Sequence, residues 1–192
     1  MNTELINSAF NEHIDLAKET LNSIAVKIEE SSEVIARSIE SGGTIFWCGN
    51  GGSASDSQHL AGELIGRFEG DRRPLKSVSL TADSAVMTCI ANDFGYEHIF
   101  SRQVEALGSE GDILVGITTS GNSQNVINAF KVAESKGMQT IGLLGKGGGM
   151  AKTLVHKSII VSSKSTARTQ EMHMLIGHIL CDLIEEGLSL KK

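Results

Sequence analysis

Short apolar runs alternate along this chain with longer stretches whose apolar residues recur at helical spacing, and this alternation restricts the fold more than any other feature. The runs that predict strands lie at 44–49, 77–81, 112–119, 140–145 and 158–163. The stretches that predict helices lie near 53–66, 83–92, 97–107, 122–136 and 167–187. Because most of the runs are apolar on both faces, they suit a parallel sheet that helices cover on each side. The sequence therefore predicts an α/β fold.

A long amphipathic segment precedes the first strand. Residues 3–40 carry apolar side chains at helical spacing, among them Leu5 and Phe10, and no turn signal. We expect one long helix and then a second that reaches about Ile39, ended by the small residues at 41–43. Such an opening is more often a packing or oligomer surface than a catalytic element.

The length of 192 residues favours a single domain. We expect residues 1–192 to form one domain, in which residues 1–40 are N-terminal helices for oligomer packing and residues 41–192 are the α/β core. The 21 glycines against one proline indicate loops whose backbone approaches something closely.

Charge and cysteine content exclude several classes of protein. A formal net charge of −6 argues against a general nucleic-acid binder, although backbone N–H groups can still bind a phosphate. Cys48, Cys89 and Cys181 are odd in number and scattered, which is typical of reduced thiols. The N-terminus is polar and no apolar stretch approaches the roughly 20 residues that span a bilayer. We therefore expect a cytoplasmic protein without a membrane partner.

Two strand ends carry unusual loops. The first strand is followed by Asn50, Gly51, Gly52 and Ser53, and the third ends in the run TTSGNS at 118–123. Each loop leads into a helix, whose N-terminus offers free N–H groups and a partial positive charge. Ordinary turn and N-cap chemistry also uses Ser, Thr and Asn. Two such loops at the carboxyl ends of strands, one with four hydroxyl residues, nevertheless favour an anion site. The stretch GKGGGM at 145–150 is interpreted as a flexible connection without function.

Two helices carry residues suited to acid–base or metal chemistry. His59 and Glu63 stand four apart on the predicted helix 53–66, so they share a face. This pair suits a metal, a base with its orienting partner, or simply a solvated face.

The last helix contains Gln170, Glu171, His173 and His178 within an apolar stretch. His178 is flanked by apolar residues, so its imidazole must find a partner, either as a satisfied core histidine or as a functional one. Helical periodicity favours Glu171 as the residue above His178, whereas Gln170 lies about 80° round the axis, and spacing alone does not choose between them.

At these residues the sequence resembles a known family. The motifs CGNGGSxxDxxHxxxEL, ANDFG, SRxVEALGxEGDxLxGxxTSGNS and RxQEMHxxxxH occur in order along nearly the whole chain. They resemble the sedoheptulose-7-phosphate (phosphoheptose) isomerases of the sugar-isomerase (SIS) domain family. The resemblance implies a flavodoxin-like three-layer sandwich with a five-stranded parallel sheet, and a homotetramer. It also implies conversion of sedoheptulose 7-phosphate to D-glycero-D-manno-heptose 7-phosphate, which feeds the ADP-heptose route to the lipopolysaccharide core.

The resemblance also implies roles for particular residues. Glu63 and His178 match the family's acid/base pair. The matched zinc ligands, for one zinc per subunit, are His59, Glu63, Gln170 and His178. The matched substrate contacts are Asn50, Gly51, Gly52, Ser53, Glu63, Asn92, Asp93, Thr118, Thr119, Ser120, Ser123 and Gln170. The long reach between Gln170 and His178 suggests that each site of the tetramer lies at a subunit interface and draws on more than one chain.

The implied reaction moves a proton between adjacent carbons through an enediol. We expect Glu63 to take the proton from carbon and His178 to serve the oxygens as acid and base. The main alternative is a non-enzymatic SIS-domain relative that binds the replication initiator. That branch lacks the acid and the imidazole at the positions of Glu63 and His178, and its glycine loop is altered, so the intact residues here favour the enzyme. A second alternative is an isomerase of a different phosphosugar, because loops that bind phosphate and hydroxyl groups do not distinguish sugars by the length of their carbon chain.

Overall fold

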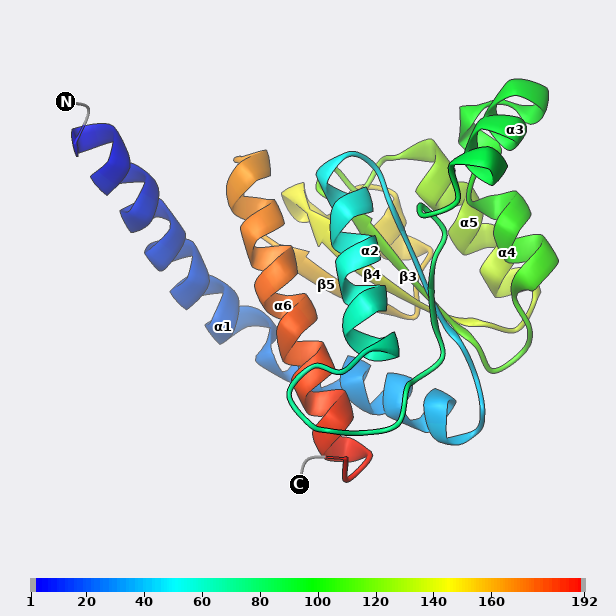
Figure 1. The fold of residues 1–192 in the computed structure, drawn as a ribbon. Coiled ribbons are helices and arrows are strands. Elements are labelled where there is room, and N and C mark those ends of the chain that lie inside the picture. Colours follow the sequence, from blue (N-terminus) through cyan, green and yellow to red (C-terminus); the bar gives the residue numbers. More distant parts are fainter. Residues whose placement is uncertain (1–2, 191–192) are drawn as a thin grey trace.

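The chain folds around one five-stranded parallel sheet with the strand order β2-β1-β3-β4-β5 (Figure 1). The computed structural model describes residues 3–190. The strands are β1 (Ile45–Gly49), β2 (Ser77–Ser79), β3 (Ile113–Thr118), β4 (Gln139–Gly145) and β5 (Lys157–Val161). The α-helices are α1 (Thr3–Glu40), α2 (Gly52–Ile65), α3 (Ser84–Phe94), α4 (Ser101–Leu107), α5 (Gln124–Ser135) and α6 (Thr166–Gly187). Short 3-10 turns are η1 (Tyr96–His98), η2 (Lys146–Gly148) and η3 (Ala151–Thr153). The α/β class and the five parallel strands are confirmed.

Helices cover both faces of the sheet, as the apolar runs predict. Successive residues of β1 point to opposite faces: Ile45 and Trp47 join a core with α1, α2 and α6, whereas Phe46 and Cys48 join a second core with α3, α4 and α5. All residues of β1 and β3 are buried, which is expected of central parallel strands. The result is three layers, α/β/α. No helix within residues 3–190 is long and apolar enough to cross a lipid bilayer.

The N-terminal segment differs from the expectation of two helices. Residues 3–40 form one continuous helix of 38 residues, because the segment contains neither glycine nor proline to end the first part. From Leu16 onward it packs on the sheet and α6, whereas its first turns project from the body (Figure 1) and are joined to α6 by the contacts of Ala9 and His13.

Two further expectations are corrected. The helix predicted at 97–107 is broken into η1 and α4, and the break falls at Ile99 and Phe100, whose adjacent side chains are both fully buried. The stretch 145–150 is not a free connection, because it packs on the loop after β3. The Ala151 N–H donates to the Gly121 carbonyl at 2.9 Å, and a Cβ at Gly121 would collide with the Gly148 backbone.

The strand order places the two unusual loops side by side. The chain leaves β1 toward β2 on one side and returns to β3 on the other, so the order reverses between β1 and β3. Gly49 at the end of β1 lies in register with Ile117 near the end of β3. Ligands of open α/β sheets bind in the crevice outside such a switch point, which is where both loops emerge.

The core histidine of α6 is His173, not His178. His173 is fully buried, and burial lowers the pKa of its imidazole to about 4, although the nearby backbone of Leu144 opposes the shift. The folded protein therefore disfavours the protonated ring, whereas the unfolded chain takes up the proton near pH 6.5.

A pH-dependent loss of stability follows from this burial. Above pH 6.5 the ring is neutral in both states and His173 contributes no pH dependence. Between pH 6.5 and about 4 the unfolded state binds more protons than the folded state. The free energy of unfolding therefore decreases as the pH is lowered through this range, by up to about 3 kcal/mol. Urea unfolding at several pH values measures this, with His173→Leu as the reference that cannot titrate. Parallel pH profiles for the two proteins would contradict it.

Candidate active site

The loop after β3, here called the serine loop (residues 118–123), gathers three hydroxyl groups. Thr118 Oγ1 lies 3.0 Å from Ser123 Oγ and 3.3 Å from Ser120 Oγ, and it accepts the Gly121 N–H at 3.2 Å. Ser123 is the N-cap residue of α5, so these hydroxyls lie at the positive end of a 12-residue helix. Thr119 is half-buried beside them, and its carbonyl abuts Gly145. The arrangement suits the oxygens of an anion without adding net charge.

The loop after β1, here called the glycine loop (residues 50–53), turns directly into α2. Gly51 has φ +57°, a left-handed conformation that favours glycine, and Ser53 is buried in the first turn of the helix. Gly52 lies against α6, since a Cβ there would be 2.5 Å from Gln170 Nε2. The absence of a side chain at Gly52 therefore lets Gln170 approach the loop.

Asn50 ties the two loops together. Its amide exchanges two hydrogen bonds with the buried amide of Asn125 on α5, at 2.8 and 2.9 Å, and its Oδ1 also accepts the Tyr96 hydroxyl at 3.0 Å. Sequence reasoning did not assign Asn125 or Tyr96. The run TSGNSQN contains Asn125, so an amide in the first turn of α5 was the available signal.

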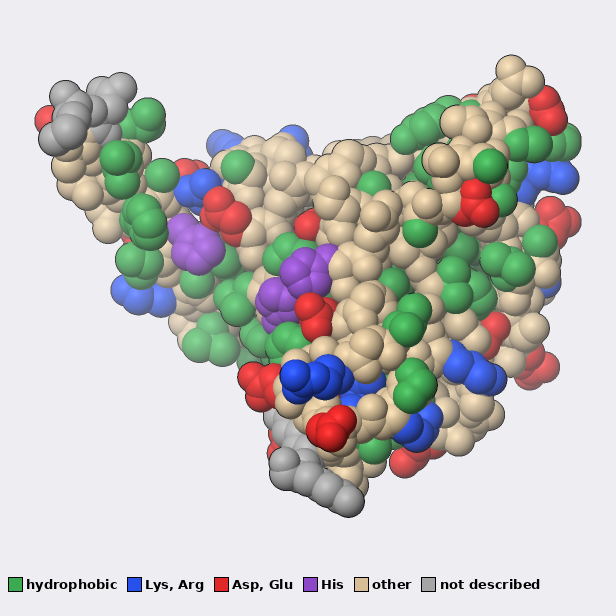
Figure 2. Space-filling view, in the orientation of Figure 1, with side chains coloured by type: hydrophobic (Ala, Val, Ile, Leu, Met, Phe, Trp, Pro, Cys, Tyr) green, Lys and Arg blue, Asp and Glu red, His purple; other side chains and the backbone are tan. Residues whose placement is uncertain are grey.

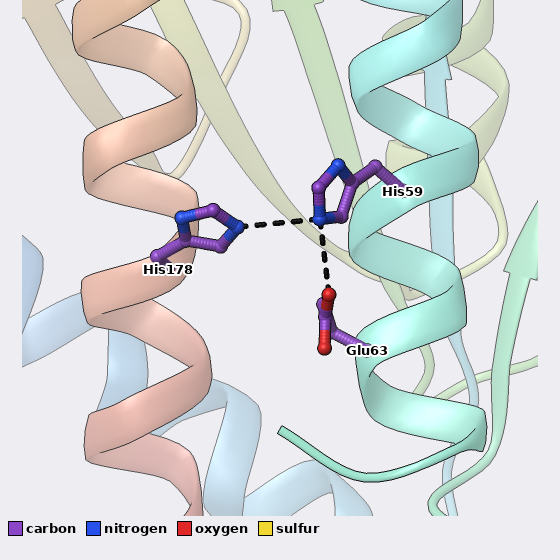
Figure 3. Close-up of side chains that lie close together, drawn as sticks. All are labelled: His59, Glu63 and His178. Atoms are coloured by element: carbon purple, nitrogen blue, oxygen red, sulfur yellow. Dashed lines mark hydrogen bonds and ion pairs between the residues drawn. The ribbon is translucent and has the colours of Figure 1, made fainter. Parts of the chain in front are cut away.

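His59, Glu63 and His178 converge between α2 and α6 (Figure 3). His59 Nε2 lies 3.0 Å from Glu63 Oε1 and 3.4 Å from His178 Nε2. The i,i+4 spacing on α2 brings the first two together, and the packing of α6 on α2 adds the third. We call these three residues the His/Glu cluster. Histidine side chains are visible at the molecular surface beside an acidic group (Figure 2), so the cluster is open to solvent.

The geometry of the His/Glu cluster fits a zinc ion. One imidazole nitrogen or carboxylate oxygen from each residue lies within 4.8 Å of the other two. Ligands at about 2.0–2.2 Å from a tetrahedral zinc are roughly 3.4 Å apart, close to the two measured separations. Two imidazoles and one carboxylate are also a donor set that zinc prefers, and three protein ligands leave a position for substrate.

The two candidates on α6 are separated by the structure. Glu171 faces α1, where its carboxylate contacts His13 at 2.7 Å, and it also accepts from Arg168 of its own helix at 2.6 Å. Gln170 lies beside Gly52, the first residue of α2, whereas Glu63 lies in the last turns of that helix. Within this chain, therefore, Gln170 lies beside the glycine loop, whereas Glu171, which periodicity favours, is engaged at α1. The His/Glu cluster comes from one chain, so the idea of a shared site depends on Gln170 and on residues outside the cluster.

Asn92 and Asp93 are not brought to the loops within this chain. Both are exposed on α3, and the Asn92 amide donates to Asp93 Oδ1 at 2.7 Å. The helix α3 protrudes at the opposite side of the fold from α6 (Figure 1).

An aromatic side chain that the sequence did not single out covers His178. The Phe68 ring stacks on the His178 imidazole with centroids 5.5 Å apart and planes 25° from parallel. Phe68 lies in the loop between α2 and β2, in a stretch without a recognisable motif. Phe68 and His178 are 110 positions apart in the sequence, so the spacing of nearby residues could not predict their contact.

Comparisons with known proteins agree with this geometry. The SIS domain model matches residues 10–145. The phosphoheptose isomerase of Helicobacter pylori (strain P12) is 47% identical over 188 residues, which cover 98% of each chain.

Solved structures of phosphoheptose isomerases from Neisseria gonorrhoeae and Francisella tularensis superpose with TM-scores of 0.92 and 0.93, at 39% and 38% identity. Each alignment covers 97% of this chain, and 100% and 99% of the respective structures. The similarity thus extends over nearly the whole chain. This chain belongs to the phosphoheptose isomerase branch of the SIS domain family.

Proposed function

We propose that the protein isomerises sedoheptulose 7-phosphate to D-glycero-D-manno-heptose 7-phosphate. The observation that carries this is the His/Glu cluster, an acid–base group on the helix α2 that begins at the glycine loop. His59 follows Gly52 by seven residues, about 10 Å along the helix axis, and the two anion-suited loops emerge at one switch point. Relatives aligned over the full chain bear the name phosphoheptose isomerase. A non-enzymatic protein that binds the replication initiator is not favoured, because such a protein has no use for this cluster.

The substrate's phosphate would bind the hydroxyls of the serine loop and Ser53. The backbone of Gly51 and Gly52 lies beside this position and offers N–H groups at the N-terminus of α2. The remaining contacts of the sugar would come from Asn50, Thr119 and Gln170. The phosphate thus anchors one end of the sugar while the other end reaches toward the His/Glu cluster.

Proton transfer would be performed by two groups of this cluster. Glu63 takes a proton from carbon 1 of the ketose, the carbon 2 oxygen gains a proton, and an enediol forms. Glu63 then returns a proton to carbon 2 while the carbon 1 hydroxyl loses its own, which leaves the aldose. His178 serves the two oxygens as acid and base. Where no zinc is bound, the His59 Nε2–H donates to Glu63 Oε1 at 3.0 Å and so orients the carboxylate.

Zinc would be held by His59, Glu63 and His178. Gln170, the fourth ligand that the family resemblance implies, lies at the other end of α2 in this chain, so it would come from a neighbouring subunit. A bound zinc polarises the reacting oxygens of the sugar.

The assembly would be a homotetramer whose sites lie between subunits. Asn92 and Asp93 on the protruding α3 lie away from the loops of their own chain, which supports a role in a neighbour's site. The helix α1 exposes large apolar side chains along its length (Figure 2), which are Leu5, Ile6, Phe10, Ile14, Leu21 and Val26. An apolar face of this size on a projecting helix suits burial against other copies.

The apolar face of α1 gives a prediction about assembly. Leu21 lines a groove between α1 and α6 together with Leu175 and Ile179 of α6. Leu21→Glu is expected to shift the mass from four chains to fewer, because a buried carboxylate without a partner opposes association. Light scattering after size exclusion measures this, with Leu107→Glu on α4 as the control at an equally exposed leucine. A wild-type protein that runs as a monomer would contradict the proposed tetramer.

The cellular role would be the supply of the heptose phosphate for ADP-heptose and the lipopolysaccharide core, in the cytoplasm. The sugar length is tested by incubation with sedoheptulose 7-phosphate and, in parallel, with fructose 6-phosphate and ribulose 5-phosphate, followed by chromatographic identification of the aldose. We expect product from the seven-carbon ketose. If only a shorter ketose phosphate is turned over, the protein is an isomerase of that phosphosugar and the proposed heptose specificity is wrong.

A further inference from the structure

A buried ion pair that the proposed reaction does not use lies beneath the His/Glu cluster. The carboxylate of Glu185 on α6 and the guanidinium of Arg72 are 0% and 1% exposed, and Glu185 Oε1 accepts the Arg72 Nε–H at 2.6 Å. The same carboxylate accepts three consecutive backbone N–H groups, from residues 68, 69 and 70, at 3.1, 3.2 and 2.9 Å. Burial alone would raise the pKa of Glu185, but hydrogen bonds from Gly70 and Arg72 hold it below its ordinary value.

Arg72 connects this carboxylate to the end of α2. Its Nη2 donates to the Glu63 carbonyl at 2.8 Å and its Nη1 donates to the Leu64 carbonyl at 2.9 Å. These are carbonyls of the last turn of the helix, which have no partner within the helix and which a cation stabilises. The backbone of Glu63 is therefore held by the same pair that holds residues 68–70.

The three held N–H groups begin with that of Phe68, whose ring stacks on His178. Glu185 lies seven residues after His178, which places both on nearly the same face of α6. Thus α6 presents the imidazole and, two turns further on, the carboxylate that fixes the loop covering that imidazole. One ion pair is joined to the backbone of Glu63 and, through Phe68, to the ring of His178.

We infer that Glu185 and Arg72 are positioning residues for the reaction, which act by holding Phe68 against His178 and the last turn of α2 beneath Glu63. This inference rests on the proposed function. A buried ion pair contributes little net stability compared with apolar residues of the same volume. Its role here is to position other groups, because the Glu185 carboxylate accepts three consecutive N–H groups of the loop 68–70 as well as the Arg72 Nε–H, which ties that loop to α6.

The first test compares two buried carboxylates. Glu185→Gln keeps the shape but replaces one accepting oxygen by an NH₂ group that faces donors. We expect kcat to fall by about 10–100-fold with KM changed far less, the range that outer-shell partners of a site show. Asp112→Asn is the matched control, since Asp112 is also buried and accepts two backbone N–H groups, of Thr44 and Ser109, but contacts neither the loop 68–70 nor the end of α2 in any hydrogen bond of the described residues. It should lower the melting temperature without lowering kcat in the folded protein.

A second test asks whether the aromatic ring of Phe68 is needed or only an apolar side chain of similar size. It also tests the inference if Glu185→Gln fails to fold. Phe68→Leu should lower kcat, whereas Phe68→Tyr, which keeps a stacked ring, should restore most of it. In protein labelled with ¹³C at histidine Cε1, the His178 resonance should move in Phe68→Leu and Glu185→Gln, because the ring current is lost or redirected, and should stay in place in Asp112→Asn.

The outcomes are distinguishable from those of the proposed function. The His178 resonance is read without substrate, so it reports positioning even where the wild-type protein turns over no heptose phosphate. An unmoved resonance together with full kcat in Phe68→Leu and Glu185→Gln would overturn the inference while leaving the isomerase intact.

Discussion

Glu63→Gln is expected to lower kcat of the isomerisation by roughly 10²–10⁴-fold, the range that general acid–base groups contribute. The amide has nearly the shape of the carboxylate, so the contact with His59 at 3.0 Å can persist while the base is lost. Glu63 is part-exposed at the surface of α2, and the fold should therefore remain. Initial rates with sedoheptulose 7-phosphate, together with a circular dichroism melt, measure both effects.

Glu110→Gln, an exposed carboxylate at the amino edge of the sheet, serves as the control and should turn over normally. Substantial residual activity in Glu63→Gln, with its melt unchanged, would remove Glu63 from the role of base.

The second large effect concerns zinc. His59→Ala and His178→Ala each remove one of the three convergent donors, and we expect each to weaken zinc binding by more than about 100-fold, beyond the range that outer-shell changes cause. Competition with a chromophoric zinc indicator measures the affinity. The wild-type protein stripped with a chelator should regain its lost activity when zinc is added.

The control for this experiment is His156→Ala. His156 also pairs with a carboxylate, that of Glu134 at 3.3 Å, but it lies away from the cluster with a single such partner. Equal zinc affinity in wild type, His59→Ala and His178→Ala would show that the cluster is not the metal site.

Most of the fold follows from local patterns in the sequence. Parallel strands buried on both faces leave apolar runs, and β1, β3 and β4 lie within about one residue of the predicted runs. The long helix α1 was divided in the prediction although no residue within 3–40 breaks it, so the error lay in expecting a helix of ordinary length. The division of 97–107 depends on how Ile99 and Phe100 pack in the core, which spacing does not encode.

The site was predictable only as far as its residues lie close in sequence. His59 and Glu63 share a face of one helix, and each loop is a continuous run. Spacing leaves Gln170 and Glu171 open, and it does not reveal that His13 of α1 binds Glu171 across 158 positions. Phe68 and Glu185 were missed for the same reason, since their contacts span more than 100 positions and carry no motif.

The most direct test of the site is proton NMR of the wild-type protein with sedoheptulose 7-phosphate, with and without added zinc, beside Glu63→Gln. We predict a new aldose anomeric signal in the wild-type sample, enhanced by zinc, and none with Glu63→Gln. Folded, zinc-loaded wild-type protein that forms no aldose would contradict the proposal that Glu63 and His178 interconvert a ketose and an aldose phosphate.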